Sequence, residues 1–418
     1  MASQRGMTLY SLIDTFMEAL KLRRQYRQLP DSDDRVTEEQ VSALESAPSR
    51  PRRKCPSCCI CCYRNRSLIC KAVGIPILIL IGFAIFKIIV WANSDPPTGL
   101  ENMPQFGTSL GCAALSHSTA STMKIPFDKD SSEHMFDAYG DILGTFTLVA
   151  TTQDETEVRY ELTISSNDPA LLNTVTFREP EMSADGALQS SQFVLISPGA
   201  PANSDACLRY DIKLFVPPSL KKLHIASHTT MHLKIDPESH FHLDMFYATL
   251  YALSTNNLIL PHHTLHANTL GLEVYRGWIV GDASIGETTS ITTQRGDGVA
   301  NVKVHPSPPK TRDAPEKAVL WTVTGAGRSA FTWIADGSAL KRPIEADHKS
   351  SKNGVIYLTY RNANFNGLLA LNARSYLTKN VYTIENANKT DKWNHWAGDR
   401  SGSDRLTLQS RGWTSLYF

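Results

Sequence analysis

The pattern of apolar and polar residues divides the chain into three parts. Residues 72–92 form an apolar run whose one charged residue is Lys87. At about 1.5 Å per helical residue the run spans about 31 Å, the thickness of a bilayer's hydrocarbon core. Lys87 is near enough to the end of the run to reach the lipid headgroups, and Trp91 lies where interfacial aromatic residues are common. We therefore predict a transmembrane helix over residues 72–92, with the lipid bilayer as a partner.

The charges beside this run predict its orientation. Residues 50–71 contain many basic residues and neither Asp nor Glu, whereas the first basic residue after the run is Lys124. Because positive charge stays on the cytoplasmic side, we expect a cytosolic N-terminus and place residues 93–418 outside the cell or in a lumen. The run begins too far along the chain, and is too long, for a cleaved signal peptide. The expected product is a type II, single-pass membrane protein with an uncleaved signal anchor.

The cytosolic part divides into three segments. Residues 1–28 place apolar side chains on one helical face, followed by basic residues, which predicts an amphipathic helix on the membrane or on a partner; a transiently helical tail is the alternative. Residues 29–54 are rich in charged residues, Ser and Pro, and are expected to be disordered. Residues 55–71 form a basic, cysteine-rich juxtamembrane segment.

Six of the eight cysteines lie in this juxtamembrane segment. Cysteines on the cytosolic side of a membrane helix, among basic residues, are typical S-acylation sites. Two C-x-x-C pairs also suggest zinc, but structural zinc sites separate their pairs by roughly a dozen residues or more, and here the pairs are adjacent. Acylation is therefore preferred over metal binding and over unmodified thiols. The predicted sites are Cys55, Cys58, Cys59, Cys61, Cys62 and Cys70.

Beyond the membrane the pattern changes to alternation with a period of two. Residues 93–139 are expected to form a stalk, and residues 140–418 a β-rich ectodomain. Apolar and polar residues alternate in residues 157–165 and 208–216, as they do in half-buried strands. Further strands are predicted at residues 143–150, 192–197, 318–323, 355–360, 381–385 and 405–409.

Residues 220–304 contain short β-runs that recur roughly every ten to twenty residues and are separated by turn residues. This loose repeat predicts a β-solenoid core, in which each coil buries its apolar face on the next, with antiparallel strands flanking it. A β-sandwich fits the same alternation and stays the alternative. Residues 243–253 also fit a helical period, and the Pro- and charge-rich residues 305–317 are expected to form a loop.

Two motifs carry a resemblance to a known family. VPPSLKKLHIAS at residues 216–227 opens the run of short strands with Asn- and Gly-marked turns, and SRGWTSL at residues 410–416 closes it. Over residues 140–418 the chain resembles the putative-adhesin β-solenoid domains, a family of unknown function that fungal membrane proteins of similar layout carry behind one transmembrane helix. The resemblance implies a β-solenoid ectodomain and brings no catalytic residues with it.

Charge is nearly balanced over the whole chain but not along it. Lys and Arg number 42 and Asp and Glu 41, a formal net charge of +1. Residues 1–71 carry 13 basic and 8 acidic residues, while residues 93–418 are mildly acidic. A basic tail beside a bilayer suits anionic lipid. The acidic ectodomain gives no sign of a nucleic-acid partner, and we expect none.

Histidines are concentrated in the predicted solenoid core. Eight of thirteen fall within residues 224–266, namely His224, His228, His232, His240, His242, His262, His263 and His266. Strand alternation turns one set of side chains inward (Leu223, Ile225, Phe241, Leu243 and Met245) and the other outward (His224, His240 and His242). A coil of about eighteen residues would bring His224 close to His242. Such a row could bind a metal, respond to acid or simply face solvent, and we assign it neither a metal nor a cofactor.

The acidic residues bear on whether the protein is an enzyme. Many β-solenoids cleave polysaccharides with clustered carboxylates, so a membrane-anchored carbohydrate-active enzyme is the alternative function. Most of the available carboxylates lie at turns, show no catalytic spacing and accompany no hydrolase or phosphate-binding motif. They are Asp236, Glu238, Asp244, Glu273, Asp282, Glu287 and Asp297. We predict that the protein is not an enzyme and has no catalytic residues.

The remaining candidates suit a structural role or the binding of a surface protein or glycan. Aromatic rings that could stack on sugars, or pack in the core or at an edge, are Tyr247, Tyr251, Tyr275, Trp278, Trp393 and Trp396. Asn388 lies in the one glycosylation sequon on the lumenal side. Cys112 and Cys207, the two cysteines beyond the membrane, could form a disulfide.

Overall fold

The computed structural model divides the chain into two compact units, residues 1–95 and residues 96–418. It describes residues 81–87, 98–112, 115–180, 188, 190–198, 206–335, 341–385 and 392–418. The predicted cytosolic segments, with their six candidate acylation sites, lie outside the described residues, as does Asn388.

Part of the predicted membrane segment is described. Residues 81–87 are helical and their side chains are exposed. The remainder of residues 72–92 lies outside the described part. Among the described residues no helix has both the length and the apolar character needed to cross a bilayer. The transmembrane helix therefore stays a prediction.

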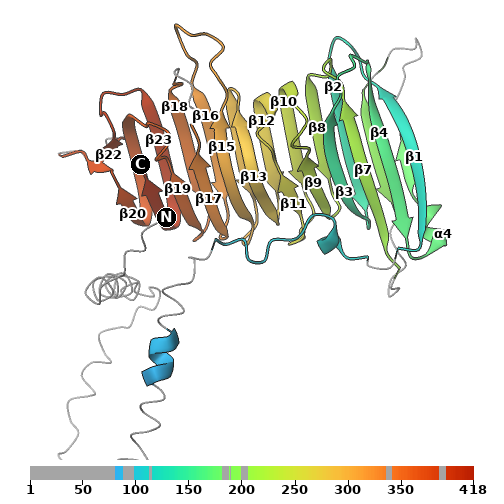
Figure 1. The fold of residues 1–418 in the computed structure, drawn as a ribbon, viewed down its shortest axis with the longest axis horizontal. Coiled ribbons are helices and arrows are strands. Elements are labelled where there is room, and N and C mark those ends of the chain that lie inside the picture. The colour runs from blue at the N-terminus through green and yellow to red at the C-terminus, as the bar shows by residue number, and fades with distance from the viewer. Residues whose placement is uncertain are drawn as a thin grey trace, which may run out of the picture. The chain divides into compact units, whose positions relative to one another are not determined.

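The second unit is a β-solenoid in which each coil contributes one strand to each of two parallel ladders (Figure 1). The first ladder contains, in spatial order, β6 (Gln192–Ser197), β2 (Glu133–Gly140), β8 (Lys222–Ser227), β10 (Phe241–Leu250), β12 (Leu265–Val274), β14 (Thr288–Thr293), β16 (Ala318–Thr324), β18 (Ile344–Ser350), β23 (Asp404–Tyr417) and β20 (Gly367–Lys379). The second contains β7 (Leu208–Val216), β3 (Leu143–Ala150), β9 (Met231–Ile235), β11 (Leu258–Leu260), β13 (Trp278–Ile285), β15 (Val299–Pro306), β17 (Arg328–Trp333) and β19 (Val355–Thr359), which pairs with the C-terminal part of β23.

Antiparallel strands flank the ladders. β1 (His117–Pro126) pairs with β4 (Glu157–Ser166), which pairs with β7, and β5 (Thr176–Arg178) pairs with β6. At the other end β22 (His395–Ala397) pairs with β20 and with β21 (Tyr382–Thr383). Two short helical turns, η2 (Thr108–Leu110) and α4 (Pro169–Leu172), complete the described elements. The predicted mainly β fold, a solenoid with flanking antiparallel strands, is confirmed, and the parallel pairing rules against the sandwich.

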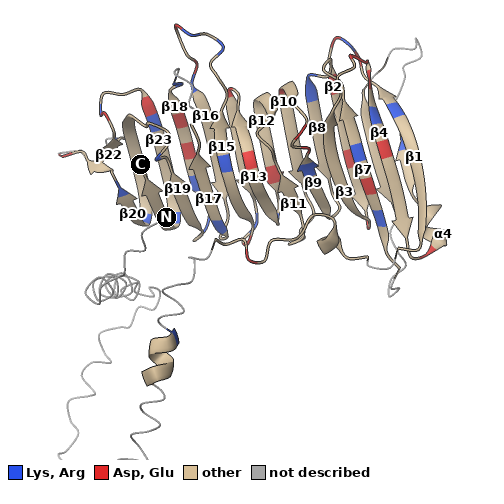
Figure 2. Cartoon of the chain, viewed as in Figure 1, with Lys and Arg blue, Asp and Glu red and all other residues tan. Residues whose placement is uncertain are grey.

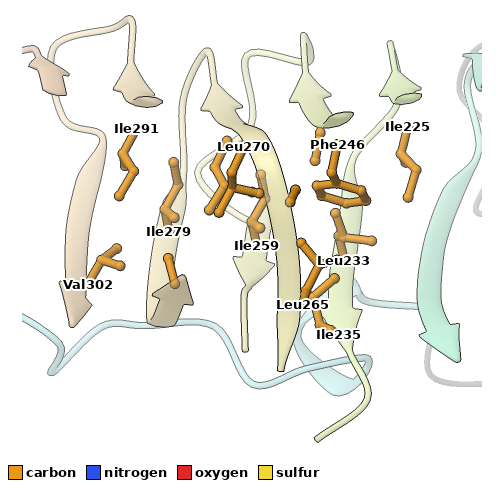
Figure 3. Close-up of a cluster of buried hydrophobic side chains, with 14 of the residues drawn as sticks. Ile225, Leu233, Ile235, Phe246, Ile259, Leu265, Leu270, Ile279, Ile291 and Val302 are labelled. Carbon is orange, nitrogen blue, oxygen red and sulfur yellow. The ribbon is translucent and has the colours of Figure 1, made fainter. Parts of the chain in front are cut away.

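The hydrophobic core lies between the two ladders and repeats from coil to coil. Leu223, Phe246 and Leu270 are cross-strand neighbours on successive strands and are almost fully buried. Leu233 and Ile259 form the matching column on the second ladder (Figure 3). Because each side chain packs on its equivalent in the next coil, no coil can bury its apolar face alone.

A bulge in β10 changes the expected facing of its side chains. The backbone N–H groups of Asp244 and Met245 both donate to the Lys221 carbonyl, at 2.8 and 3.1 Å. Two consecutive residues therefore face away from the core, so that Met245 is half-buried instead of pointing fully inward. The predicted inward set is otherwise buried, with Phe241 and Leu243 among its members.

The coil is also longer than expected. His224 stands beside Tyr247, which follows it by 23 residues, and His242 stands beside His266. The expected proximity of His224 to His242 is therefore wrong. The bulge and the intervening turn lengthen the coil, and neither is visible in the alternation of the strands themselves.

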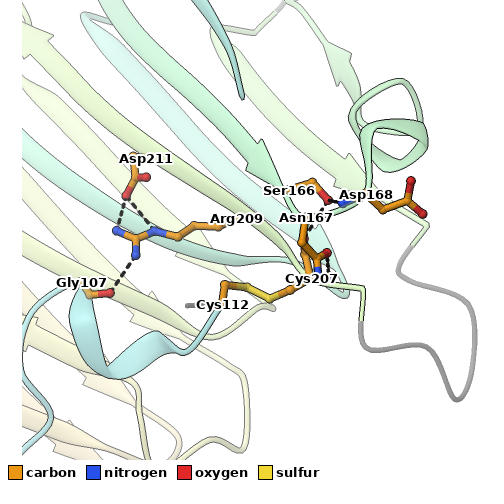
Figure 4. The surroundings of a disulfide bond; sticks show 8 residues. All are labelled: Gly107, Cys112, Ser166, Asn167, Asp168, Cys207, Arg209 and Asp211. Atoms are coloured by element: carbon orange, nitrogen blue, oxygen red, sulfur yellow. Dashed lines mark hydrogen bonds and ion pairs between the residues drawn. A yellow bond between two sulfur atoms is a disulfide. The ribbon is translucent and has the colours of Figure 1, made fainter. Parts of the chain in front are cut away.

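The segment expected to be a stalk is folded onto the solenoid. Residues 98–112, which we name the N-terminal strap, run along the ends of the coils (Figure 1). The Gly107 carbonyl accepts a hydrogen bond from Arg209 Nη1 at 2.8 Å, and its N–H donates to His232 Nδ1 at 2.9 Å. Cys112 forms a disulfide with Cys207, the pair suggested by the sequence, with a Cα–Cα distance of 5.6 Å (Figure 4). Residues 117–126 and 133–139, also within the expected stalk, form β1 and most of β2.

Candidate functional site

The outward face of the first ladder presents a row of residues, one from each coil. Ser290 on β14, Trp321 on β16, Asp347 on β18 and Thr407 on β23 are cross-strand neighbours. Among these polar neighbours the Trp321 ring is 52% exposed. A large aromatic ring held in solvent by a rigid strand is a typical element of a binding surface.

Trp321 lines a groove of about 610 Å³ on this face. Trp393, from the segment that leads into β22, also lines it, and polar side chains of successive coils make up most of the remainder. The volume is in the range of sites for small ligands. The groove is therefore the candidate functional site.

Two ion pairs hold part of the groove's lining in place. Lys317 pairs with Glu345 at 2.7 Å, and Lys349 pairs with Asp347 at 2.8 Å. The second oxygen of Asp347, Oδ1, is buried and has no hydrogen-bond partner among the described residues. A buried acceptor without a donor is costly, and Asp347 carries that cost beneath the groove.

Two further cations give the groove an excess of positive charge. Lys392 and Arg405 line it, and within the described part of the chain neither forms an ion pair. Their charges lie 4.7 and 5.7 Å from the centroid of the Trp393 ring, within reach of a cation–π interaction. With four cations against two carboxylates, the groove favours an anionic ligand, although acidic and basic residues are interleaved on the neighbouring strands (Figure 2).

Most of the aromatic residues singled out from the sequence have structural roles elsewhere. Tyr247 lies over Gly271, where a Cβ would approach the ring to 2.2 Å. Trp278 donates from its indole nitrogen to the Thr255 carbonyl at 2.9 Å. Trp396 stacks on Tyr382, with the ring centroids 4.6 Å apart. Packing or hydrogen bonding within the fold therefore accounts for the positions of these three side chains.

A separate aromatic row crosses the coils at the ends of four strands. His228 stacks between Tyr139 and Tyr251, at centroid distances of 4.4 and 4.5 Å, and Tyr251 lies 5.3 Å from Tyr275. Both faces of the His228 ring are covered, and so is one face of Tyr251, which leaves these faces unavailable to a sugar. Of the six predicted aromatic residues, Trp393 is the one that lines the groove.

Trp321 was not singled out from the sequence. It lies in AVLWTVT, where apolar residues occur at both parities and a buried strand is the natural expectation. The exposure of Trp321 depends on how β16 is aligned with β14 and β18. That alignment involves strands that are distant in the sequence.

The predicted histidine row is divided among several environments. His240 and His242 are exposed and His224 is half-buried, so the predicted outward facing of these three is observed. His242 and His266 line a second groove of about 450 Å³. His232 instead is buried beneath the strap, and this burial lowers its pKa to about 4.

The carboxylates considered for catalysis are held separately. Six of the seven accept a hydrogen bond from a partner of their own: Asp236 from Ser239, Asp244 from Asn268, Glu273 from Gln294, Asp282 from His305, Glu287 from Lys310 and Asp297 from Arg276. The hydrogen bond and charge of Arg276 lower the pKa of Asp297. A glycosidase needs a carboxylic acid whose pKa is raised beside a second carboxylate, and this arrangement of separate partners differs from that pattern.

No model of a known protein family and no curated protein matches the sequence. Several solved structures are similar in part. A "putative adhesin" from Parabacteroides distasonis is 11% identical, with a TM-score of 0.38, over 71% of this chain and 97% of that one. A "putative cell adhesion protein" from Clostridium sporogenes is 7% identical, with a TM-score of 0.21, over 72% and 99%. A "putative adhesin" from Bacteroides fragilis is 11% identical, with a TM-score of 0.29, over 58% and 97%.

Proposed function

We propose that the protein is a non-catalytic binding module in which the groove between Trp321 and Trp393 holds an acidic glycan. The exposed Trp321 ring at the centre of β16 carries this proposal. A sugar ring has an apolar face that stacks on an indole, and its hydroxyl groups bind carboxylates and ammonium groups around it. The groove offers both kinds of contact.

The charge of the groove supports an acidic sugar over a neutral one. Lys392 and Arg405 lack carboxylate partners among the described residues, and a uronate, sialate or sulfate group would supply one. Arg405 is held by its own hydrogen bonds to the Gly402 and Asp404 carbonyls, at 2.7 and 2.6 Å. A cation fixed before binding loses little side-chain entropy when the ligand arrives.

The proposal is tested with the full-length chain, purified in a mild detergent and applied to an array of acidic and neutral glycans. We expect binding to acidic glycans that weakens as salt is raised. Trp321→Ala and Trp393→Ala should each weaken it by about tenfold or more, as for a central aromatic contact. Trp278→Ala, on the second ladder, is the matched control. An array without binding, or equal binding by Trp321→Ala, would refute the proposal.

The proposal includes a membrane anchor at residues 72–92, supported by the length and apolarity of that run. A protease applied to intact cells should reach the folded unit and spare residues 1–71. Digestion of the tail instead would reverse the orientation. Hydroxylamine-sensitive acyl label should disappear when the six juxtamembrane cysteines are changed to serine, and label that persists would place acylation elsewhere.

A further inference from the structure

Three side chains meet on the outer surface of the second ladder, away from the groove. His263 lies in the turn between β11 and β12, Asp282 on β13 and His305 on β15. One nitrogen or oxygen atom from each lies within 4.8 Å of the other two. His305 Nε2 is 3.3 Å from Asp282 Oδ1, and the rings of His263 and His305 are stacked with centroids 4.9 Å apart.

The backbone brings the turn and the strand together. The Asp282 N–H donates to the Pro261 carbonyl at 3.2 Å, which places the carboxylate beside the turn that carries His263. Gly281 makes this approach possible, since it has a φ of 150° and a Cβ there would lie 2.5 Å from the Pro261 oxygen. Two of the three groups thus stand on strands and the third on a turn that a strand holds in place.

Attraction between opposite charges alone does not explain why Asp282 contacts a histidine, because a lysine lies beside it on the next strand. Lys303 is the cross-strand neighbour of Asp282, and its side chain is exposed. Among the described residues Lys303 forms no ion pair, and the carboxylate contacts His305 instead. The result is a carboxylate and two imidazoles gathered at one point, beside a lysine that pairs with no carboxylate among the described residues.

We propose that His263, Asp282 and His305 bind a Zn²⁺ ion. In a tetrahedral zinc site with bonds of about 2.0 to 2.1 Å, neighbouring ligand atoms are about 3.3 Å apart, which is the distance between His305 Nε2 and Asp282 Oδ1. His263 is exposed, so its ring can turn toward the other two. Two imidazoles and one carboxylate suit Zn²⁺ better than Ca²⁺ or Mg²⁺, which prefer sites made of oxygen ligands.

The fourth position would be taken by water or by His262. The His262 ring lies 4.4 Å from that of His263, and its Nδ1 contacts the Thr264 hydroxyl at 2.9 Å. Its other nitrogen, Nε2, is the atom that could reach the ion. The bound ion would link the β11–β12 turn to β13 and β15 and so stabilise the stack of coils locally.

The test uses the full-length chain in which the six juxtamembrane cysteines are changed to serine, because thiolates in the tail would themselves bind zinc. After treatment with a chelator, ZnCl₂ is titrated calorimetrically and the bound metal is measured by mass spectrometry. We expect one ion per chain with micromolar affinity or better and a higher melting temperature. Asp282→Ala and His305→Ala should each weaken binding by about tenfold or more.

Two further measurements test whether the zinc is bound at this site and not elsewhere on the chain. Zinc binding should be unchanged in His117→Ala, which removes an exposed histidine from β1 at another place in the fold. Co²⁺ should give the visible absorption of a tetrahedral site, and His263→Ala should abolish it. Absence of zinc binding, or binding that Asp282→Ala and His305→Ala leave unchanged, would overturn the proposal.

Discussion

Asp404 and Lys341 form an ion pair at the start of the last coil, and the Asp404 side chain is only 1% exposed. The carboxylate also accepts the Ile344 N–H at 2.8 Å and the Asn366 N–H at 2.7 Å. One buried carboxylate therefore joins three segments that are distant in sequence, the beginnings of β18 and β23 and the turn before β20.

We expect Asp404→Ala to destabilise the fold by about 3 to 5 kcal/mol, because it leaves two backbone N–H groups and a lysine without their shared acceptor. Chemical denaturation of the full-length chain measures the loss. Asp399→Ala is the control, since Asp399 is an exposed aspartate whose carboxylate contacts Ser401 in a loop. A loss from Asp404→Ala no larger than that of the control would contradict this account.

Acid should destabilise the protein through its buried histidines. His348 binds the hydroxyls of Thr322 and Tyr360, each at 2.8 Å, and burial lowers its pKa to about 3. Between about pH 6.5 and pH 3 this histidine binds a proton in the unfolded chain but stays neutral in the folded chain. This contribution to stability is therefore complete above about pH 6.5 and is lost as the pH falls toward 3.

Between pH 7 and pH 4.5 the loss from His348 should be about 2 to 3 kcal/mol. His348→Gln removes this titration, so the difference in stability between pH 7 and pH 4.5 should shrink by that amount whatever the variant's stability at neutral pH. His117→Gln, at an exposed position on β1, should keep the full acid dependence. His134, buried with a pKa of about 3, should behave as His348 does. An unchanged acid dependence in His348→Gln would refute the assignment.

Reduction of the Cys112–Cys207 disulfide should destabilise the second unit. The bond closes a separation of 95 residues and fixes the strap to the start of β7. Loss of a crosslink over such a span costs about 2 to 4 kcal/mol. Reductant should lower the melting temperature of the native chain to that of Cys112→Ser/Cys207→Ser and leave the double variant unaffected. A double variant as stable as the oxidised native chain would exclude this role.

Substitution by alanine should destabilise the fold at Gly144 but not at Gly296. The Tyr210 ring lies over Gly144, and a Cβ there would come within 2.0 Å of it, whereas a Cβ at Gly296 would meet nothing within 4 Å. Because the ring is fully buried and cannot move aside, Gly144→Ala should cost about 1 to 3 kcal/mol. Gly296→Ala should be nearly neutral in the same unfolding assay. Equal effects would mean that the ring is less tightly held than the structure indicates.

Local alternation was sufficient to predict many strands. The predicted bounds of β3, β6 and β7 coincide with those observed. β7 alternates along its whole length, whereas β6 is a short apolar run between polar residues. β1 was missed because HSTASTMKIP is almost entirely exposed and mostly polar, so no apolar face distinguishes it from a stalk. The loop predicted from residue 305 begins slightly later, because β15 continues to Pro306.

The groove and the cluster of His263, Asp282 and His305 could not be predicted from the pattern of any single strand. Trp393 is one of the six rings that the sequence offers for stacking on a sugar, but its groove also needs Trp321 and Arg405, which come from coils far apart in the sequence. In the sequence His263 belongs to the histidine-rich segment and Asp282 to the candidate carboxylates, while His305 begins the Pro- and charge-rich residues 305–317. Their meeting depends on Gly281, whose backbone conformation allows β13 to approach the preceding turn.

The strap has a mechanical consequence. A force that pulls on residue 98 would first peel away the hydrogen bonds at Gly107, which are few and break one at a time. At Cys112 the tension would pass through a covalent bond into β7, which is flanked by β3 on one side and β4 on the other. The load would then be shared by two whole rows of backbone hydrogen bonds, so the domain should resist traction applied from its N-terminal side.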